Sequence, residues 1–188
     1  EFPDLAAFNA ALADHLLGHP SLTLAPKSHA TRFGRHSGEL LVEPKGPVAA
    51  LEGMIMAAVE EYREAVPPDL DHPFLAHRPE RLGLSIWGVA MDSQGHQLAH
   101  IHPSAWLSGV YYPKIPAVIA ADDPDHAGWI EFGRPPEDFY ASVEPDVRLI
   151  NPEEGLMVLF PSYFYHRTIP YESDDVRISV AFDVLAAE

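Results

Sequence analysis

The pair His100-Ile101-His102 is the strongest chemical signal in the sequence. On a β-strand, residues two apart point to the same face, so these two imidazoles are placed to share one metal ion. A third histidine, His166, lies near the end of a predicted strand pair, and in an antiparallel barrel a late strand can lie beside an early one. Because the chain has no cysteine, any metal must be held by nitrogen and oxygen ligands. We predict a metal site formed by His100, His102 and His166.

A second signal is the arginine in the last apolar segment, Val176-Arg177-Ile178-Ser179-Val180. The alternation places the apolar side chains on one face of a strand and Arg177 with Ser179 on the other. A planar guanidinium matches a carboxylate with two parallel hydrogen bonds, which favours an anion site facing the histidines. Two simpler interpretations stay open. With 11 histidines in the chain, one H-x-H pair can arise by chance, and Arg177 can be an exposed residue on a half-solvated strand.

Three segments together resemble a known family. They read HIHPSAWLSGVYY at 100–112, GLMVLFPSYFYH at 155–166 and VRISVAFD at 176–183. They are similar to the H-x-H-P…S-G-V-Y-Y, G…F-P-S…H and R-x-S blocks of an uncharacterised bacterial branch of the 2-oxoglutarate and iron(II)-dependent oxygenases. The resemblance is specific over 82–188 and weak before residue 82. It implies a double-stranded β-helix and an enzyme that uses Fe(II) and 2-oxoglutarate to hydroxylate a substrate.

The resemblance also implies roles for individual residues. By its blocks, His100 and His166 bind iron, while Arg177 and Ser179 hold the distal carboxylate of 2-oxoglutarate. Tyr112 resembles a tyrosine that often reaches the cosubstrate carboxylate, although the sequence does not decide which tyrosine of the Tyr111-Tyr112 pair faces inward.

The sequence departs from the family pattern at one position. Most of these enzymes use an H-x-D…H triad, which leaves coordination positions for the oxoacid and oxygen. Here His102 replaces the carboxylate, so a bound iron would be more positive and would favour the anionic cosubstrate. Two alternatives remain open at this stage. Asp92 or Glu131 could supply the oxygen ligand, or the ion could be a metal other than iron.

Two other functions are compatible with parts of the pattern. The spacings G-x4-H-x-H at 95–102 and G-x5-P at 155–161, followed by His166, also resemble cupin metal enzymes. Cupins usually add a glutamate shortly after the histidine pair, however, and 103–110 contains none. A non-catalytic jelly-roll binding module is the third hypothesis, supported by the missing triad carboxylate. An oxygenase is favoured over a cupin because cupins do not need Arg177.

These residues require a framework of two helices followed by many strands. Apolar positions at helical spacing predict helices over 2–18 and Val48–Val66, the second ended by Pro67-Pro68. A possible strand covers Glu39–Glu43. From residue 82 the apolar period changes from 3.6 to 2, and the following segments are predicted as strands: 82–91, 96–102, 106–112, 117–121, 128–132, 147–150, 155–160 and 176–184.

The predicted fold is therefore α+β, a double-stranded β-helix (jelly roll) core with N-terminal helices packed on its outer face. We expect one oxygenase-like domain over 1–188, with a helical support region at 1–81 and the β-helix core at 82–188. The chain begins at Glu1 rather than at a methionine, so it is expected to be a processed product or a piece of a longer protein.

The amino-acid composition limits the classes of molecule that the protein is expected to bind. The formal net charge is −16, which repels a phosphate backbone and disfavours nucleic acid and anionic lipid as partners. No stretch is long and apolar enough to cross a membrane, and we expect a cytoplasmic protein. The expected partner is a small-molecule or peptide/protein substrate, neutral or basic in charge. The sequence predicts neither the substrate nor the oligomeric state.

Overall fold

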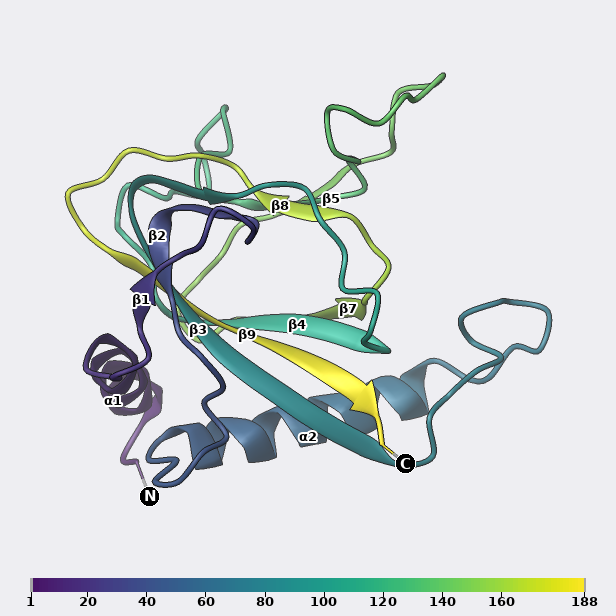
Figure 1. The fold of residues 1–188 in the computed structure, drawn as a ribbon, viewed down its shortest axis with the longest axis horizontal. Helices are drawn as coiled ribbons and strands as arrows, with labels where there is room; N and C mark the ends of the chain where they lie inside the picture. The colour runs from purple at the N-terminus through teal and green to yellow at the C-terminus, as the bar shows by residue number, and fades with distance from the viewer. Residues whose placement is uncertain (1, 188) are drawn as a thin grey trace.

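A computed structural model describes residues 2–187, and its two helices lie on one side of the molecule (Figure 1). Helix α1 spans Leu5–Leu17 and helix α2 spans Val48–Ala65. The Asp4 side chain caps α1 by accepting a hydrogen bond from the Ala7 amide at 2.8 Å, as an N-cap aspartate is expected to do. No helix of residues 2–187 combines the length and apolar character needed to span a membrane.

The strands of residues 2–187 form two sheets. Their bounds are β1 Thr23–Leu24, β2 Thr31–His36, β3 Leu82–Gln97, β4 Leu107–Lys114, β5 Ile130–Phe132, β6 Arg148–Ile150, β7 Met157–Pro161, β8 His166–Thr168 and β9 Arg177–Ala186. The larger sheet has the order β1-β2-β3-β9-β4-β7 and the smaller has the order β6-β5-β8. All pairings are antiparallel. The smaller sheet lies above the larger one, on the side opposite α2 (Figure 1).

The backbone at His100 extends the smaller sheet by one position. The amides and carbonyls of His100 and His166 exchange two hydrogen bonds, each 3.1 Å long, beside β8. Two facing antiparallel sheets with this order form a double-stranded β-helix, so the predicted fold is confirmed. The same pairing places the early and the late histidine side by side, as the barrel argument predicted.

Both helices cover the outer face of the larger sheet, as predicted. The residues of β9 that face them are fully buried together with residues of α1, α2 and β4. The β9 members of this core are Ile178, Val180, Phe182 and Val184. Gly109 of β4 leaves room for the Phe182 ring, because a Cβ at that glycine would lie 2.2 Å from Phe182 Cζ. The apolar alternation of β9 therefore anchors the sheet to the helices and turns its polar face toward the smaller sheet.

Several strand predictions were wrong in detail. The segment 39–43 is not a strand, because the Glu39 carboxylate bonds the Leu41 and Ile86 amides and replaces part of a backbone ladder. The segment 117–121 is a turn region that follows Pro113 and Pro116, which have no amide hydrogen to donate.

The remaining differences concern strand limits. β3 continues through residues 92–95, which separate the predicted strands 82–91 and 96–102 and where Gln94 takes a positive φ of 63°. The residues at 98–102 leave the strand except at His100. The strands β1, β2 and β8 were not predicted. β1 and β8 have only two and three residues, and β2 reads TRFGRH, which lacks an apolar alternation.

Candidate metal centre

The structure brings together the three histidines that the sequence singles out. His100 and His102 lie on the segment after β3, and His166 begins β8. Ligand atoms of the three side chains all lie within 4.8 Å of one another. Their ring centroids are 4.2 Å apart for His100 and His166, 5.1 Å for His100 and His102, and 5.2 Å for His102 and His166.

The hydrogen bonds of the three rings determine which nitrogen is available. Nδ1 of His100 lies 2.7 Å from the Leu98 carbonyl oxygen, and Nδ1 of His166 lies 3.0 Å from the Phe164 carbonyl oxygen. Since a carbonyl oxygen only accepts hydrogen bonds, each of these Nδ1 atoms must carry the hydrogen. The lone pair is then on Nε2. In this tautomer Nε2 is the nitrogen that can bind a metal ion.

Burial keeps two of the ligands in their neutral form. It lowers the pKa of His100 to about 4, and burial with the charge of His100 lowers the pKa of His166 to about 3. Both rings are therefore uncharged at neutral pH, and a metal ion does not have to displace a proton from either of them.

His102 is oriented by a residue that the sequence analysis missed. Nδ1 of His102 donates to Oδ1 of Asp183 at 2.7 Å, and the Ser108 hydroxyl donates to the same oxygen at 2.6 Å. Asp183 lies on β9 and pairs with Ser108 of β4 across the sheet. A signal for Asp183 was present, because it lies six residues after Arg177 and therefore faces the same side of a strand.

Arg177 is buried on that same inward face of β9. Its exposure is 1%, and its guanidinium carbon lies 5.0 Å from the centroid of the Tyr112 ring. Its Nη1 lies 3.8 Å from the sulfur of Met91, whereas its Nε has no hydrogen-bond partner. Within residues 2–187 no carboxylate lies at salt-bridge distance from Arg177. The structure thus holds a buried cation that its own side chains do not neutralise, which is costly without a ligand.

The structure also separates the two tyrosines. Tyr112 faces the interior beside Arg177, and its burial raises the pKa of its hydroxyl, which stays protonated. Tyr111 points to α1, where its hydroxyl donates to Asn9 Oδ1 at 2.6 Å. Tyr112 is therefore the inward residue of the pair.

One interior chamber connects the histidines with the arginine. Its lining includes Trp87, His100, His102, Tyr112, Phe160, His166, Arg177 and Ser179. It is narrow, with a volume of about 30 Å³, which is room for roughly two water molecules. The indole of Trp87 stacks on the His102 ring with centroids 5.7 Å apart. All six residues predicted for the site thus lie on one continuous surface.

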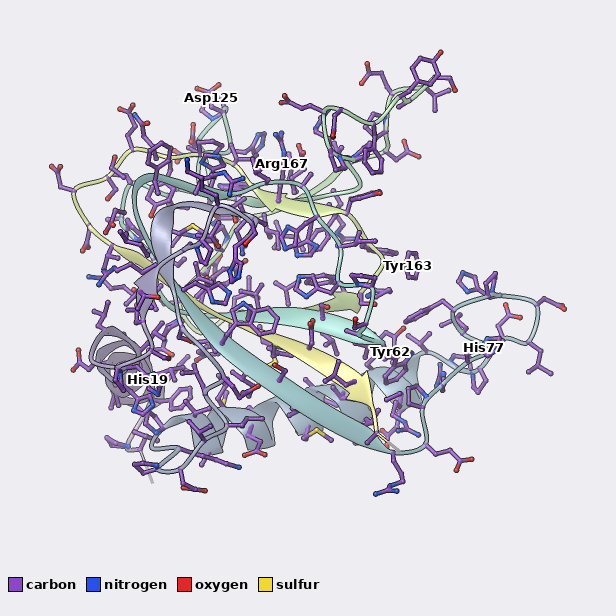
Figure 2. The ribbon with its side chains drawn as sticks, viewed as in Figure 1. His19, Tyr62, His77, Asp125, Tyr163 and Arg167 are labelled. Carbon is purple, nitrogen blue, oxygen red and sulfur yellow. The ribbon has the colours of Figure 1, made fainter. Side chains whose placement is uncertain are left out.

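The two alternative carboxylates lie outside this cluster. Asp92 is exposed on β3. Glu131 is buried but already accepts from Arg134 at 2.8 Å and from Arg167 at 2.7 Å, and Arg167 lies on β8 (Figure 2). Neither joins the three-histidine group.

Comparisons with known proteins agree with this geometry. The family model described as "Putative 2OG-Fe(II) oxygenase" matches residues 85–183, more than half of the chain. A search of curated proteins finds no match at a significant level.

Solved structures share the fold at low sequence identity. A Pseudomonas putida prolyl-4-hydroxylase has a TM-score of 0.60 and 16% identity, covering 100% of this chain and 90% of that chain. A Trichoplax adhaerens prolyl hydroxylase, solved with a peptide fragment of hypoxia inducible factor, has a TM-score of 0.64 and 10% identity over 97% and 78% of the two chains. HygX from Streptomyces hygroscopicus, solved with nickel and 2-oxoglutarate, has a TM-score of 0.64 and 12% identity over 97% and 79%.

Proposed function

Since the chain belongs to the 2OG-Fe(II) oxygenase family, we propose that it hydroxylates its substrate at a three-histidine iron centre with 2-oxoglutarate anchored on Arg177. Family membership makes the chain an enzyme that depends on iron(II) and 2-oxoglutarate. The proposal adds the ligand set, the anchor and the outcome of the reaction.

The histidine cluster fits a divalent metal ion. Three clustered imidazoles, two of them held neutral by burial, suit iron(II), and ligands from one face of the barrel leave further coordination positions open. His100, His102 and His166 would hold the ion. The carboxylate that most relatives place at the second position is absent from the ligand set, but Asp183 supplies a negative charge directly behind His102. We propose that Asp183 fixes the His102 tautomer and offsets part of the charge of the ion.

The arginine end of the chamber fits a dicarboxylate. The Arg177 guanidinium would pair with the distal carboxylate of 2-oxoglutarate, and the Ser179 and Tyr112 hydroxyls are placed to donate to the same group. The oxoacid end would then face the histidines. Because the chamber is smaller than the cosubstrate, its lining must separate when 2-oxoglutarate enters, and half-buried Trp87 and Gln97 are among the wall residues with access to solvent.

In this arrangement the protein would bind and orient the metal ion and the cosubstrate, and it would exclude water from them. Iron(II), when bound, supplies oxygen activation, which couples decarboxylation of 2-oxoglutarate to succinate with oxidation of a substrate C–H bond. The ligand atoms of the three histidines stay within 4.8 Å of one another, and the hydrogen bond of each Nδ1 to a fixed acceptor holds its ring in place. The apolar walls exclude bulk water, which strengthens the interaction of Arg177 with an anion.

The observation that carries the proposal is the buried, unpaired guanidinium facing the three histidines. A cupin-type metal site does not need this arginine, and a binding module without a metal does not need three clustered imidazoles. A dicarboxylate that chelates a metal requires a metal site at one end of the chamber and a cationic side chain at the other.

The direct experiment measures succinate formed from 2-oxoglutarate by the iron-loaded protein under oxygen. We expect turnover in the wild type, none in His166→Ala and at least tenfold less in Arg177→Met at limiting 2-oxoglutarate. Metal content of each variant is measured in parallel. Iron-loaded wild type that forms no succinate, or His102→Ala with full iron occupancy, would contradict the proposal.

A further inference from the structure

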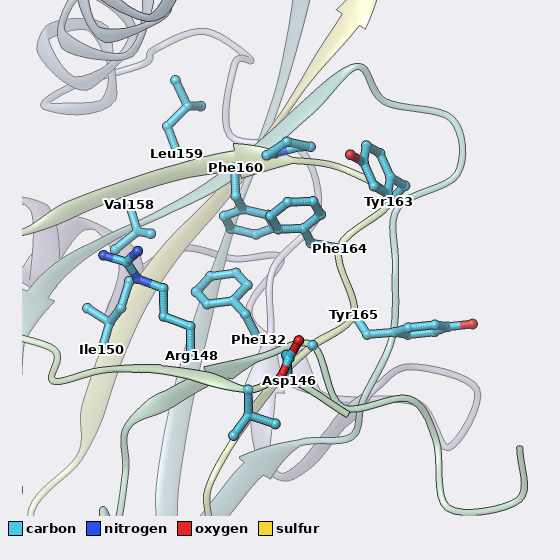
Figure 3. Close-up of a pocket in the computed structure, with 13 residues that line it drawn as sticks. Phe132, Asp146, Arg148, Ile150, Val158, Leu159, Phe160, Tyr163, Phe164 and Tyr165 are labelled. Atoms are coloured by element: carbon cyan, nitrogen blue, oxygen red, sulfur yellow. The ribbon is translucent and has the colours of Figure 1, made fainter. Parts of the chain in front are cut away.

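A second and larger cavity opens beside the metal centre (Figure 3). Its volume is about 640 Å³, within the range of small-molecule sites. It lies between the end of β7, the end of β5 and residues 146–150, where the edges of the two sheets do not pair. Five of its lining side chains are aromatic, namely Phe132, Phe160, Tyr163, Phe164 and Tyr165.

One aromatic ring separates this cavity from the metal centre. Phe160 lines both spaces, and its ring centroid lies 4.8 Å from that of His166. Phe132, on the other wall, lies 6.1 Å from the same histidine. A molecule that rests on the outer side of Phe160 is therefore adjacent to the histidines that would hold the metal ion.

The rim of the cavity exposes apolar side chains to solvent. Val147, Tyr163 and Phe164 are 41%, 46% and 40% exposed, and Tyr163 lies beyond the end of β7 at the edge of the molecule (Figure 2). Clustered exposure of large apolar groups costs free energy in water and is typical of a binding surface.

The charges near the cavity bear on the charge of the ligand that it can bind. The loop that joins β5 to β6 carries four acidic residues, Glu137, Asp138, Glu144 and Asp146, of which Asp146 lines the cavity. The loop's arginine, Arg134, is already paired with Glu131, and Arg148 is the cation of the lining. The lining itself carries one acid and one cation, Asp146 and Arg148, so a preference against anions comes from the net charge of −16 over the whole chain.

We propose that this aromatic cavity binds the apolar ring portion of a small-molecule substrate that carries no negative charge. The ring group stacks against Phe160 and Phe164, and the polar part of the molecule lies at the rim near Asp146. This inference rests on the proposed function, because it assigns the cavity as the substrate site of the same metal centre. A cavity of this size with five aromatic walls favours a compact ring system over an extended peptide chain.

A charge series of one ring system tests the assignment in the full chain. The probes are 2-naphthol, 2-naphthylmethylammonium and 2-naphthoate, titrated against protein loaded with Mn²⁺ while the probe proton relaxation is recorded by NMR. We expect the ammonium and the naphthol to bind at least tenfold more tightly than the naphthoate. Their ring protons should relax faster with Mn²⁺ than with Zn²⁺, because the cavity adjoins the paramagnetic ion. Equal affinity for the three probes, or no Mn²⁺ effect on a bound probe, would overturn the inference.

Two variants test the cavity in opposite ways, one by filling it and one by removing part of its wall, so that misfolding of one variant does not decide the test. Val158→Phe fills the cavity and should weaken probe binding at least tenfold, and Phe164→Ala removes one wall and should weaken it about threefold to tenfold. Val143→Phe is the matched control, because Val143 is 76% exposed and outside the lining. Wild-type affinity in both cavity variants rejects the site.

Metal titration of each protein is recorded first. Wild-type protein that binds no metal overturns the proposed function, whereas metal-loaded wild type that binds none of the probes overturns only the substrate-site inference.

Discussion

The two faces of β9 show how one strand serves stability and chemistry in different ways. Toward the helices it presents Ile178, Val180, Phe182 and Val184, all fully buried among apolar side chains. Toward the smaller sheet it presents Arg177, Ser179 and Asp183, of which Arg177 is equally buried but has no ionic partner. The outer face buries apolar side chains against other apolar side chains, whereas the inner face buries a charged side chain that has no ionic partner. Burial alone therefore does not show that a residue belongs to the structural core. Whether its polar atoms have hydrogen-bond or ionic partners must also be considered.

The largest expected effect comes from the outer face. Phe182→Ala removes a ring that fills the space above Gly109, and large-to-small changes of this kind cost about 3–5 kcal/mol of the free energy of unfolding. Denaturant unfolding of the metal-free protein measures it. Val143→Ala, at an exposed position, is the control and should stay within about 0.5 kcal/mol. A loss below about 1 kcal/mol for Phe182→Ala would mean that this face is not the structural core.

The inner face should respond in the opposite way. Arg177→Met replaces a buried, unpaired cation by an apolar side chain of similar length, so the free energy of unfolding should stay unchanged or rise. Binding of 2-oxoglutarate should weaken by 2–5 kcal/mol, on the order of 30-fold to several thousand-fold, because a buried charge pair loses one partner.

Calorimetry of the Ni²⁺-loaded protein with 2-oxoglutarate checks the Arg177→Met prediction. Arg81→Met, at an exposed arginine, controls for loss of a positive charge. Equal 2-oxoglutarate affinity in Arg177→Met and wild type would remove the anchor role.

The same contrast explains what could be predicted from the sequence. The β9 alternation is strict, so both of its faces were predicted correctly, and the H-x-H pair with His166 predicted a cluster that the structure forms. Asp183 was missed because its role depends on the cross-strand register with Ser108, which no single sequence reveals. The aromatic cavity was missed for a similar reason: Phe132 and Phe160 lie on different sheets and meet only when the two sheets face each other.

A smaller effect is expected at Asp183, where the inner face supports the metal through another residue. Asp183→Asn keeps the size of the side chain and an acceptor oxygen for His102 but removes the charge. Metal affinity should fall about 10- to 100-fold, as it does for comparable partners of metal-bound histidines.

Two controls accompany this Asp183→Asn variant. Ser108→Ala leaves the carboxylate charged and should lower Ni²⁺ affinity less, and the absorption spectrum of the Co²⁺ form should shift in Asp183→Asn but not in Ser108→Ala. Unchanged affinity and an unchanged spectrum in Asp183→Asn would make its bond to His102 purely structural.

The smallest effect is a pH dependence of stability to which the buried histidines opposite the inner face of β9 contribute. In the folded protein the pKa values of His100 and His166 are about 4 and about 3, whereas an unfolded histidine titrates near 6.5. Below pH 6.5 the unfolded chain therefore binds protons that the folded, metal-free protein does not. Stability from these two residues is complete above pH 6.5 and is lost as the pH falls toward 4, which amounts to about 1 kcal/mol between pH 7 and pH 6. Denaturant unfolding at fixed ionic strength measures this slope, and His166→Asn should reduce it while His77→Asn, at an exposed position, should not. Carboxylates titrate mainly below this window, so a slope that is the same in wild type and His166→Asn would show that the buried histidines are not held neutral.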